Sequence, residues 1–386
     1  MWITFVFFVI KNRMNKIVCL FAGFALMFFS ACSSDSGQTD AEFRQIVINP
    51  ERSDSPEYEN WVKGVEYIPL ETRQECLVGG DIQDVVFHDD KFYIMSDRKR
   101  VQCFDRDGKF LFNVGYEGRG PGEYSSLGNI TIDGGVVYAY CRANTILHSY
   151  DAATGEYIKS YEMPKLYSQV NVRDGYIYVT GVNLDGEKSR FVIDVMPLKN
   201  MEKVTRLYAS AEGEKIRGNW RQLYNSKDCL VWVDELRGKV WRLSDGKMES
   251  WLDFDFGDKE WSDVVLLSGG FLYNESTKVS GISNFYVYGD NIYFEYAYNK
   301  KLYNLYYNLK TGDYYNVDFM SYATPKPYYK QPLVKCATDR WIGIMLVPYR
   351  TFEGDDSIPV LFSTYNRLKG LKNDESNPVI CIYDMR

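Results

Sequence analysis

A unit of four short strand-like runs recurs along this chain, and the repeat constrains the fold more than any other feature. In each unit, alternating runs of Val, Ile, Tyr and Phe are separated by polar turns rich in Gly, Asp and Asn, which is the pattern of β-strands joined as hairpins. The units lie at residues 84–113, 129–163, 169–208, 221–256, 284–319 and, with interruptions, 334–384.

Repeats of this length predict a propeller or a solenoid, and four strands per unit favour a propeller, whose blades are four-stranded sheets. We therefore expect an all-β fold over residues 61–386, a six-bladed β-propeller of four-stranded antiparallel blades. Blades pack face to face, so both faces of each sheet need apolar side chains, which the 32 Tyr and 22 Phe of the chain can supply. An early strand at residues 65–70 is predicted to close the ring by pairing with residues 379–383 in the final blade.

The first 31 residues have the layout of a secretory signal peptide. Lys16 precedes an apolar stretch at residues 17–29, which is shorter than the roughly 20 residues of a membrane span. Met14 is an alternative start that gives a shorter signal of the same kind. The segment predicts that the chain is exported to the cell envelope.

Cys32 follows the small residues Ser30 and Ala31, which resembles a lipobox. We expect Cys32 to be lipidated, palmitate being one such acyl group, and to anchor the chain to a membrane, with the outer membrane as the expected location. An ordinary signal peptide with a chance cysteine is the alternative. Residues 32–60 begin small, polar and acidic, and are interpreted as a flexible tether.

Charge and cysteine spacing exclude two classes of function. Removal of residues 1–31, which carry three basic and no acidic residues, leaves 42 basic and 52 acidic residues, whereas a generic nucleic-acid binder is basic. We therefore expect no nucleic-acid partner. The six cysteines beyond Cys32 never form a Cys-x-x-Cys pair, which argues against a zinc knuckle or redox pair, although export permits disulfides.

The remaining motifs do not make a catalytic or metal site. The glycine-rich run at 115–122 is interrupted by Pro121 and leads into a strand, so it is predicted to be a crossover between blades rather than a phosphate loop. The Asp-x-Asp-Gly at 105–108 is interpreted as a hairpin turn rather than a calcium loop. His88 and His148 are the only histidines, and both are expected to be structural. We predict no metal and no cofactor.

One stretch resembles a known family. Residues 104–111, the run 115–124 and residues 130–133 look like the six-bladed β-propeller lipoproteins of Bacteroidetes-type bacteria, which are distantly similar to NHL-repeat propellers. The Gly-x-Gly-Pro-Gly-Glu-Tyr run at 118–124 is the most specific part of the likeness. The resemblance implies a propeller fold and an envelope location, and it implies no reaction.

Basic residues are predicted to gather on one face of this acidic propeller. The loops between the second and third strands of each blade share a face with the crossovers, and several of them contain Arg or Lys. A cationic mouth would attract anionic ligands, whereas ordinary solvated charges are the plain alternative. The candidate ligand-binding residues are Arg98, Arg100, Arg119, Glu123, Tyr124, Arg142, Arg237, Lys300 and Arg350.

These features favour a membrane-anchored binding module over an enzyme. Its loop face would hold a ligand, with an anionic glycan or an envelope protein as the expected partner. A propeller enzyme, such as a glycan hydrolase or lyase or a lactonase-like hydrolase, is the first alternative, because fold does not decide function. A structural subunit of an envelope complex is the second.

Overall fold

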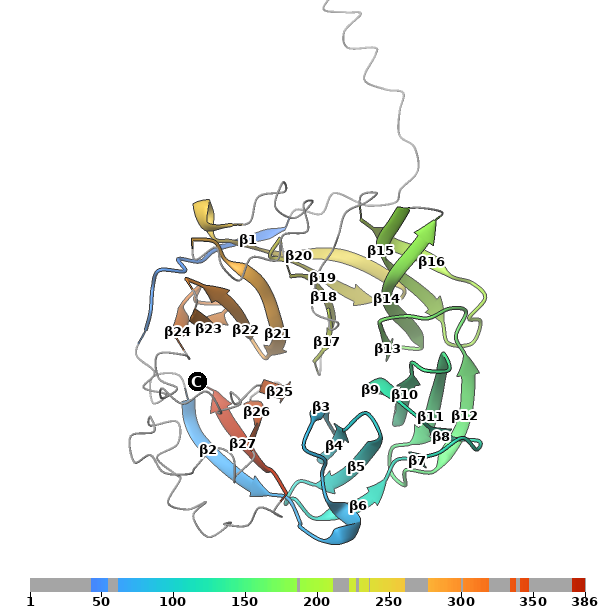
Figure 1. Ribbon diagram of the computed structural model, residues 1–386. Helices are drawn as coiled ribbons and strands as arrows, with labels where there is room; N and C mark the ends of the chain where they lie inside the picture. The colour runs from blue at the N-terminus through green and yellow to red at the C-terminus, as the bar shows by residue number, and fades with distance from the viewer. Residues whose placement is uncertain are drawn as a thin grey trace, which may run out of the picture. The chain divides into compact units, whose positions relative to one another are not determined.

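In the computed structural model, the innermost strand of each sheet lies beside the innermost strands of its neighbours around a common axis (Figure 1). We call these innermost strands the first strands. The structure describes residues 43–54, 62–185, 188–210, 222–226, 229–235, 237–260, 277–299, 301–318, 334–337, 341–346 and 377–385. They belong to one unit, Glu42–Arg386. The predicted signal peptide and Cys32 lie outside the described residues.

Almost all regular structure in the described residues is β, apart from two short 3-10 turns, η2 (Gln74–Cys76) and η3 (Gly257–Lys259). Five sheets have four antiparallel strands each. Their strands are β3 (Ile82–His88), β4 (Lys91–Ser96), β5 (Arg100–Asp105) and β6 (Phe110–Asn113); β9 (Leu127–Asp133), β10 (Val136–Cys141), β11 (Ile146–Asp151) and β12 (Tyr157–Glu162); β13 (Gln169–Arg173), β14 (Tyr176–Asp185), β15 (Lys188–Pro197) and β16 (Thr205–Ala209); β21 (Ser280–Tyr288), β22 (Asn291–Tyr298), β23 (Lys301–Asn308) and β24 (Tyr314–Asp318); and β25 (Val334–Ala337), β26 (Trp341–Leu346), β27 (Val379–Met385) and β2 (Val62–Pro69).

A further sheet has five strands, because β1 (Arg44–Val47) is added to β20 (Lys247–Asp255) beyond β19 (Lys239–Ser244), β18 (Leu230–Asp234) and β17 (Leu223–Asn225). The first strands contact one another in the order β3, β9, β13, β17, β21 and β25, and β25 returns to β3. The fold is therefore an all-β propeller of four-stranded antiparallel blades, as the repeat predicted.

The expectation that all blades would have four strands needs a correction. Five sheets have four strands, whereas the β17–β20 sheet gains β1 as a fifth, parallel strand, with Arg44 opposite Leu252 and Val47 opposite Asp255. This strand lies in the segment 32–60 that the sequence analysis assigned to a tether. Its alternation explains the pairing, because Ile46 is only 2% exposed and packs in the core while Val47 is 69% exposed.

The same N-terminal segment continues around the outside of the propeller. We call residues 44–54 the N-terminal strap. Beyond β1, the backbone of Asp54 donates to the carbonyl of Asn316 on β24 at 2.8 Å, and its carboxylate accepts from the Asn316 N–H at 2.8 Å. The strap thus joins the outer strands of two neighbouring sheets before the chain enters β2.

Ring closure follows the prediction made from the early strand. β2 pairs antiparallel with β27, with Val65 opposite Tyr383 and Pro69 opposite Val379. β2 is the outermost strand of the sheet whose other strands come from the C-terminal end of the chain. The first and last parts of the propeller therefore share one sheet.

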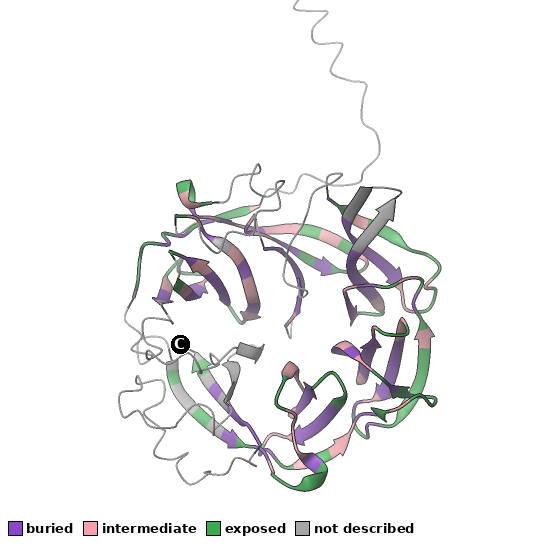
Figure 2. Cartoon of the chain, in the orientation of Figure 1, coloured by how far each residue is buried: buried purple, intermediate pink, exposed green. Residues whose placement is uncertain are grey.

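Apolar side chains from adjacent sheets meet between the blades. Tyr93 and Cys103 of one sheet pack with Leu127, Ile130 and Val137 of the next, and all are buried. Figure 2 shows buried residues along the inner strands and exposed residues on outer strands such as β12. A large apolar side chain that is fully buried contributes about 1.5–3 kcal/mol, so these interfaces explain the many aromatic residues in the sequence.

Buried polar side chains join successive first strands near the axis. The Asp84 carboxylate accepts from the Ile130 N–H at 3.1 Å. The Asn129 amide donates to the Val170 carbonyl at 2.6 Å and accepts from the Val170 N–H at 3.1 Å. First strands in different sheets do not pair with each other, and each of these side chains hydrogen-bonds instead to the backbone of the neighbouring first strand.

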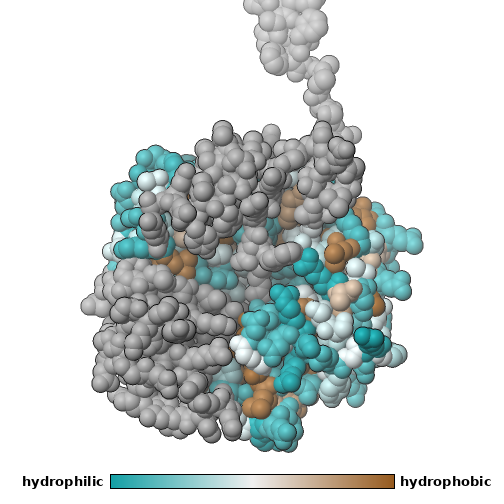
Figure 3. Space-filling view, in the orientation of Figure 1, coloured by the Kyte–Doolittle hydropathy of each residue, from teal (hydrophilic) through white to brown (hydrophobic). Residues whose placement is uncertain are grey.

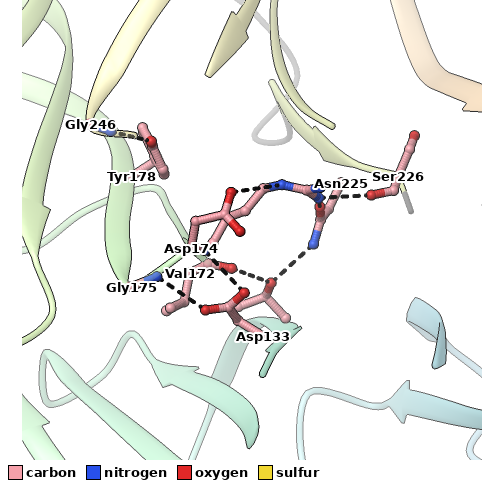
Figure 4. A network of polar contacts seen from close by, with 10 residues as sticks. Asp133, Val172, Asp174, Gly175, Tyr178, Asn225, Ser226 and Gly246 are labelled. Atoms are coloured by element: carbon pink, nitrogen blue, oxygen red, sulfur yellow. Dashed lines mark hydrogen bonds and ion pairs between the residues drawn. The ribbon is translucent and has the colours of Figure 1, made fainter. Parts of the chain in front are cut away.

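A second polar set lies where these strands turn (Figure 4). Asp133, at the end of β9, accepts from the N–H groups of Asp174 and Gly175 in the neighbouring hairpin at 3.1 and 3.3 Å. Asp174 and Gly175 have φ angles of 53° and 75°, as a type I′ turn requires. Arg173 then donates to Asn225 Oδ1 at 2.9 Å, so three successive sheets are connected.

Candidate functional site on the loop face

The hairpins between second and third strands share one end of the propeller with the crossovers between sheets, and we call this end the loop face. Two backbone hydrogen bonds show the arrangement. The Leu127 N–H, at the end of the first crossover, donates to the Arg98 carbonyl in the β4–β5 hairpin at 2.8 Å. The Arg142 N–H, beside the β10–β11 hairpin, donates to the Ser126 carbonyl at 3.2 Å. The structure therefore brings together the crossover and both neighbouring hairpins.

Arg98 and Arg119 are two of the predicted binding residues on the loop face. Both are exposed. Among the described residues, neither guanidinium forms an ion pair. The backbone N–H of Arg98 donates to Gln83 Oε1 at 3.0 Å, which fixes the hairpin while the side chain remains accessible. These two residues add exposed positive charge to the loop face.

Two other basic residues of the β4–β5 hairpin have partners within the protein. Arg100 donates from its guanidinium to the Leu77 carbonyl at 3.2 Å. Lys99, which the sequence analysis did not select, forms an ion pair with Glu117 of the crossover at 2.8 Å. Both groups are about half exposed or more, so this pair contributes at most about 1 kcal/mol, but it joins hairpin to crossover.

Glu123 and Tyr124 have positions inside the crossover. The Glu123 carboxylate accepts from the Gly120 N–H at 2.7 Å and so closes the turn at Pro121. Tyr124 is buried, and its hydroxyl donates to the Val114 carbonyl at 2.9 Å. Burial also raises the pKa of Tyr124 above its ordinary value. The structure therefore gives both residues a role in shaping the loop that presents Arg119.

The crossover runs from β6 to β9 and contains the short strands β7 (Tyr116–Glu117) and β8 (Glu123–Tyr124), which pair with each other. It leads from strand to strand, as the sequence predicted, and opens no helix. Gly122 has a φ of 74°, and a Cβ there would lie 2.5 Å from the ring of Tyr157. A glycine is required at this point because the loop lies directly on the β9–β12 sheet.

The other predicted residues are more dispersed. Arg142 is half-buried and has partners within the protein. Arg237 forms an ion pair with the buried Asp234 at 3.0 Å, in the β18–β19 hairpin. Lys300 and Arg350 lie outside the described residues. Of the predicted basic residues, Arg98, Arg100 and Arg119 are exposed, and Arg98 and Arg119 form no ion pair among the described residues.

Arg237 also lines a shallow recess on the loop face, which has room for little more than a water-sized group. Its other polar lining groups are Glu235 and Glu260, and Phe254 and Phe256 supply apolar walls. Burial and the nearby Asp255 raise the pKa of Glu260, although the hydrogen bond that its carboxylate accepts from the Phe256 N–H opposes this. No sequence pattern indicates this recess, because its lining comes from a hairpin, the end of β20, a crossover and the start of β21.

A thiol and an imidazole lie together beneath the first crossover. Cys141 and Ala139 are two residues apart on β10, and Ala139 is opposite His148 on β11, so the thiol and the imidazole project from the same face of the sheet. Both residues are buried. The exposed Ser125 of the crossover places its hydroxyl 3.8 Å from the Cys141 sulfur.

Hydrogen bonds determine how His148 is oriented. Its Nδ1 is 2.8 Å from the Ser160 hydroxyl, which is 2.8 Å from the hydroxyl of Tyr157. The other ring nitrogen, Nε2, is buried and has no hydrogen-bond partner among the described residues. Burial raises the pKa of the Cys141 thiol, but the neighbouring His148 side chain and the backbone at Ser126 and Ser125 outweigh it and lower this pKa to about 6.

The described residues contain no group of three or more His, Cys, Asp or Glu side chains placed to hold a metal ion. No helix in that part of the chain is both long and apolar enough to cross a membrane. Figure 3 shows mainly hydrophilic residues on the described surface that faces the viewer, with separate hydrophobic spots between them.

Comparisons with known proteins agree on the fold. A protein of Bacteroides fragilis that is described as exported superposes with a TM-score of 0.71 at 16% identity, over 89% of this chain and 100% of that one. A member of the DUF4221 family from Bacteroides vulgatus superposes with a TM-score of 0.51 at 12% identity, over 84% of this chain and 97% of that one. No curated protein matches the sequence significantly. The family model described as "Domain of unknown function (DUF4934)" matches residues 44–384.

Proposed function

The chain belongs to the DUF4934 family, and we propose that it is an exported propeller that binds an anionic glycan on its loop face. The observation that carries the proposal is the pair of exposed guanidinium groups, Arg98 and Arg119, which have no ion pair among the described residues. A guanidinium fork matches the carboxylate of a uronic acid or a sulfate ester with two parallel hydrogen bonds.

Several contacts within the protein hold the loop that carries Arg119 in place. The Glu123 carboxylate closes its turn, the Lys99–Glu117 ion pair joins it to the β4–β5 hairpin, and the Tyr150 hydroxyl donates to the Gly122 carbonyl at 2.8 Å. A binding group on a rigid loop loses little conformational entropy when the ligand arrives, which favours affinity. Residues that appeared to be ligand contacts in the sequence thus support the proposal as the frame of the site.

The cellular location and the number of blades complete the proposal. Export is supported by the signal-like residues 1–31 and by the exported description of the B. fragilis protein. Lipidation of Cys32 would hold the propeller at a membrane, and the outer membrane is the proposed location. The five-stranded β17–β20 sheet is proposed to serve as the sixth blade, because β17 stands in the succession of first strands between β13 and β21.

Binding is tested with the mature chain, residues 33–386, against an array of uronate-containing, sulfated and neutral oligosaccharides. We expect binding to acidic members that weakens as salt is raised, because exposed charges are screened over about 8–10 Å at physiological ionic strength. The double variant Arg98→Ala/Arg119→Ala is expected to bind about 10–30-fold more weakly, since each exposed charged contact is worth about 1 kcal/mol.

The matched control removes two positive charges from the opposite face. Lys109 and Lys247 are exposed residues in or beside hairpins between third and fourth strands, so Lys109→Ala/Lys247→Ala changes net charge equally without touching the loop face. Equal loss of affinity in both double variants would reject the site. Binding of an acidic protein but of no acidic glycan would reject the ligand class.

Anchoring is tested separately by replacing one residue. Cys32→Ser is expected to move the chain from the membrane fraction to the soluble envelope fraction, because a lipid chain contributes about 0.8 kcal/mol per buried methylene. Retention of the variant in the membrane fraction would contradict the anchor and would leave the glycan site unaffected.

A further inference from the structure

We propose that Cys141 is a peroxide-reactive thiol, paired with His148, which a hydroperoxide converts to a sulfenic acid. The pair is distinct from Arg98 and Arg119, and the proposal does not rest on glycan binding. It stands on three features already described: a thiol and an imidazole on one face of the β10–β11 pair, a buried ring nitrogen at His148, and an exposed serine against the sulfur.

The reaction needs a thiolate, since a protonated thiol is a weak nucleophile. With a pKa of about 6, the Cys141 thiol is about 90% ionised at pH 7. The titratable or polar groups around the sulfur come from three elements. They are His148 and Tyr150 on β11, Ser125 and Ser126 in the crossover, and Tyr140 and Arg142 beside it in sequence.

The chemistry is a two-electron oxidation with a defined balance. A sulfur lone pair attacks one oxygen of the hydroperoxide, an S–O bond forms and the O–O bond breaks. The departing hydroxide, or alkoxide when an organic hydroperoxide reacts, takes up the proton that the thiol gave up and leaves as water or as the alcohol. The cysteine is oxidised to a sulfenic acid and the hydroperoxide is reduced.

The Cys141 sulfur lies close to the protein surface. Cys141 is fully buried, but Ser125, whose hydroxyl contacts the sulfur, is exposed. The thiol therefore lies one side chain below the surface, at the end of β10. The proposal requires that a small hydroperoxide reach the sulfur when that serine side chain moves aside.

The same molecule contains a matched control. Cys103 is as fully buried as Cys141, but burial raises its pKa to about 12 despite a hydrogen bond with Tyr93. At pH 7 the ionised fractions differ by about 10⁵. A thiolate of low pKa is also less nucleophilic, which offsets a factor of about 10³ in rate. Cys141 is therefore expected to react about 100-fold faster than Cys103.

The experiment treats the folded mature chain with hydrogen peroxide, blocks remaining thiols after timed intervals, and measures oxidation at each cysteine by peptide mass spectrometry. The proposal expects about 100-fold faster oxidation at Cys141 than at Cys103, with a rate that rises with pH through a midpoint near 6. Equal rates at the two cysteines, or a midpoint near 9, would overturn it.

One variant separates the effect of the imidazole from that of burial. His148→Asn retains a polar group near Ser160 but removes Nε2, and is expected to slow oxidation of Cys141 at pH 6.5 by at least tenfold, roughly, because the thiol returns towards its ordinary pKa. An unchanged rate in folded His148→Asn protein would refute the pairing. If this variant does not fold, the wild-type pH profile and the comparison with Cys103 still decide the question.

Discussion

Gln169 offers the sharpest test of how the sheets are joined around the axis. It is 4% exposed, at the start of β13. Its Nε2 donates to the Leu223 carbonyl at 2.6 Å, and its Oε1 accepts from the N–H groups of Gln222 and Leu223 at 3.0 and 2.9 Å. One side chain therefore satisfies three backbone groups at β17, and Gln169→Ala removes all three bonds.

The expected cost follows from those three bonds. A hydrogen bond contributes about 1 kcal/mol net, and a buried backbone group left without a partner costs about 1–3 kcal/mol. Leu223 is almost fully buried, so water cannot replace the lost amide. We expect Gln169→Ala to lower the free energy of unfolding by about 3–5 kcal/mol. Asn129→Ala, which removes two such bonds to Val170, should cost about 2–3 kcal/mol.

The assay is urea unfolding at 25 °C, followed by tyrosine and tryptophan fluorescence. Asn144→Ala is the control, because Asn144 is exposed in the β10–β11 hairpin and surface substitutions change stability by less than about 0.5 kcal/mol. The predicted order of cost is Gln169, then Asn129, then Asn144. A cost below about 1 kcal/mol for Gln169→Ala would show that these side-chain bonds do not hold neighbouring sheets together.

Three further outcomes are expected. Ile46→Ala should cost about 2–4 kcal/mol in chemical denaturation, because this strap residue packs in the core, while Val47→Ala should cost less than about 0.5 kcal/mol. Equal costs would reject a packed strap. Glu123→Ala should speed amide hydrogen exchange at Gly120, which loses its acceptor, whereas unchanged exchange would contradict the turn closure. The folded-state pKa of Cys141 is lowered from 9.0 to about 6, so the thiol's contribution to the free energy of unfolding is complete above pH 9 and is lost as pH falls to 6. Denaturation of the wild type and of Cys141→Ser at several pH values should show this loss. A constant difference between the two proteins would refute it.

Strand periodicity was enough to predict the repeats, the antiparallel sheets and the pairing of β2 with β27. Local sequence patterns carry this information because alternation and turn residues determine hairpins. The position of β1 was not predicted, although Ile46 and Ile48 alternate with exposed neighbours. Its parallel partner, β20, is about 200 residues away in sequence, and no local pattern identifies so distant a strand edge.

The site was predicted less completely, for a physical reason. Charge in a loop can be recognised from sequence, and Arg98 and Arg119 are indeed exposed on the loop face. Whether a polar residue faces a ligand or its own loop depends on three-dimensional contacts, as Glu123 and Tyr124 show. The Cys141–His148 pair escaped notice for a related reason, since a β10–β11 register is needed to place the two side chains on one face.

Because β2 pairs with β27, the sheet that closes the propeller cannot form until both strands are present. As the chain is synthesised from its N-terminal end, residues 62–69 must wait for their partner at 379–385. Until it arrives, the edges of β2 and β26 remain open, and open edges invite aggregation and proteolysis. A chain truncated before residue 379 would therefore be open to proteases even though most of its sheets had formed, because the last sheet lacks the strand that joins β2 to β26.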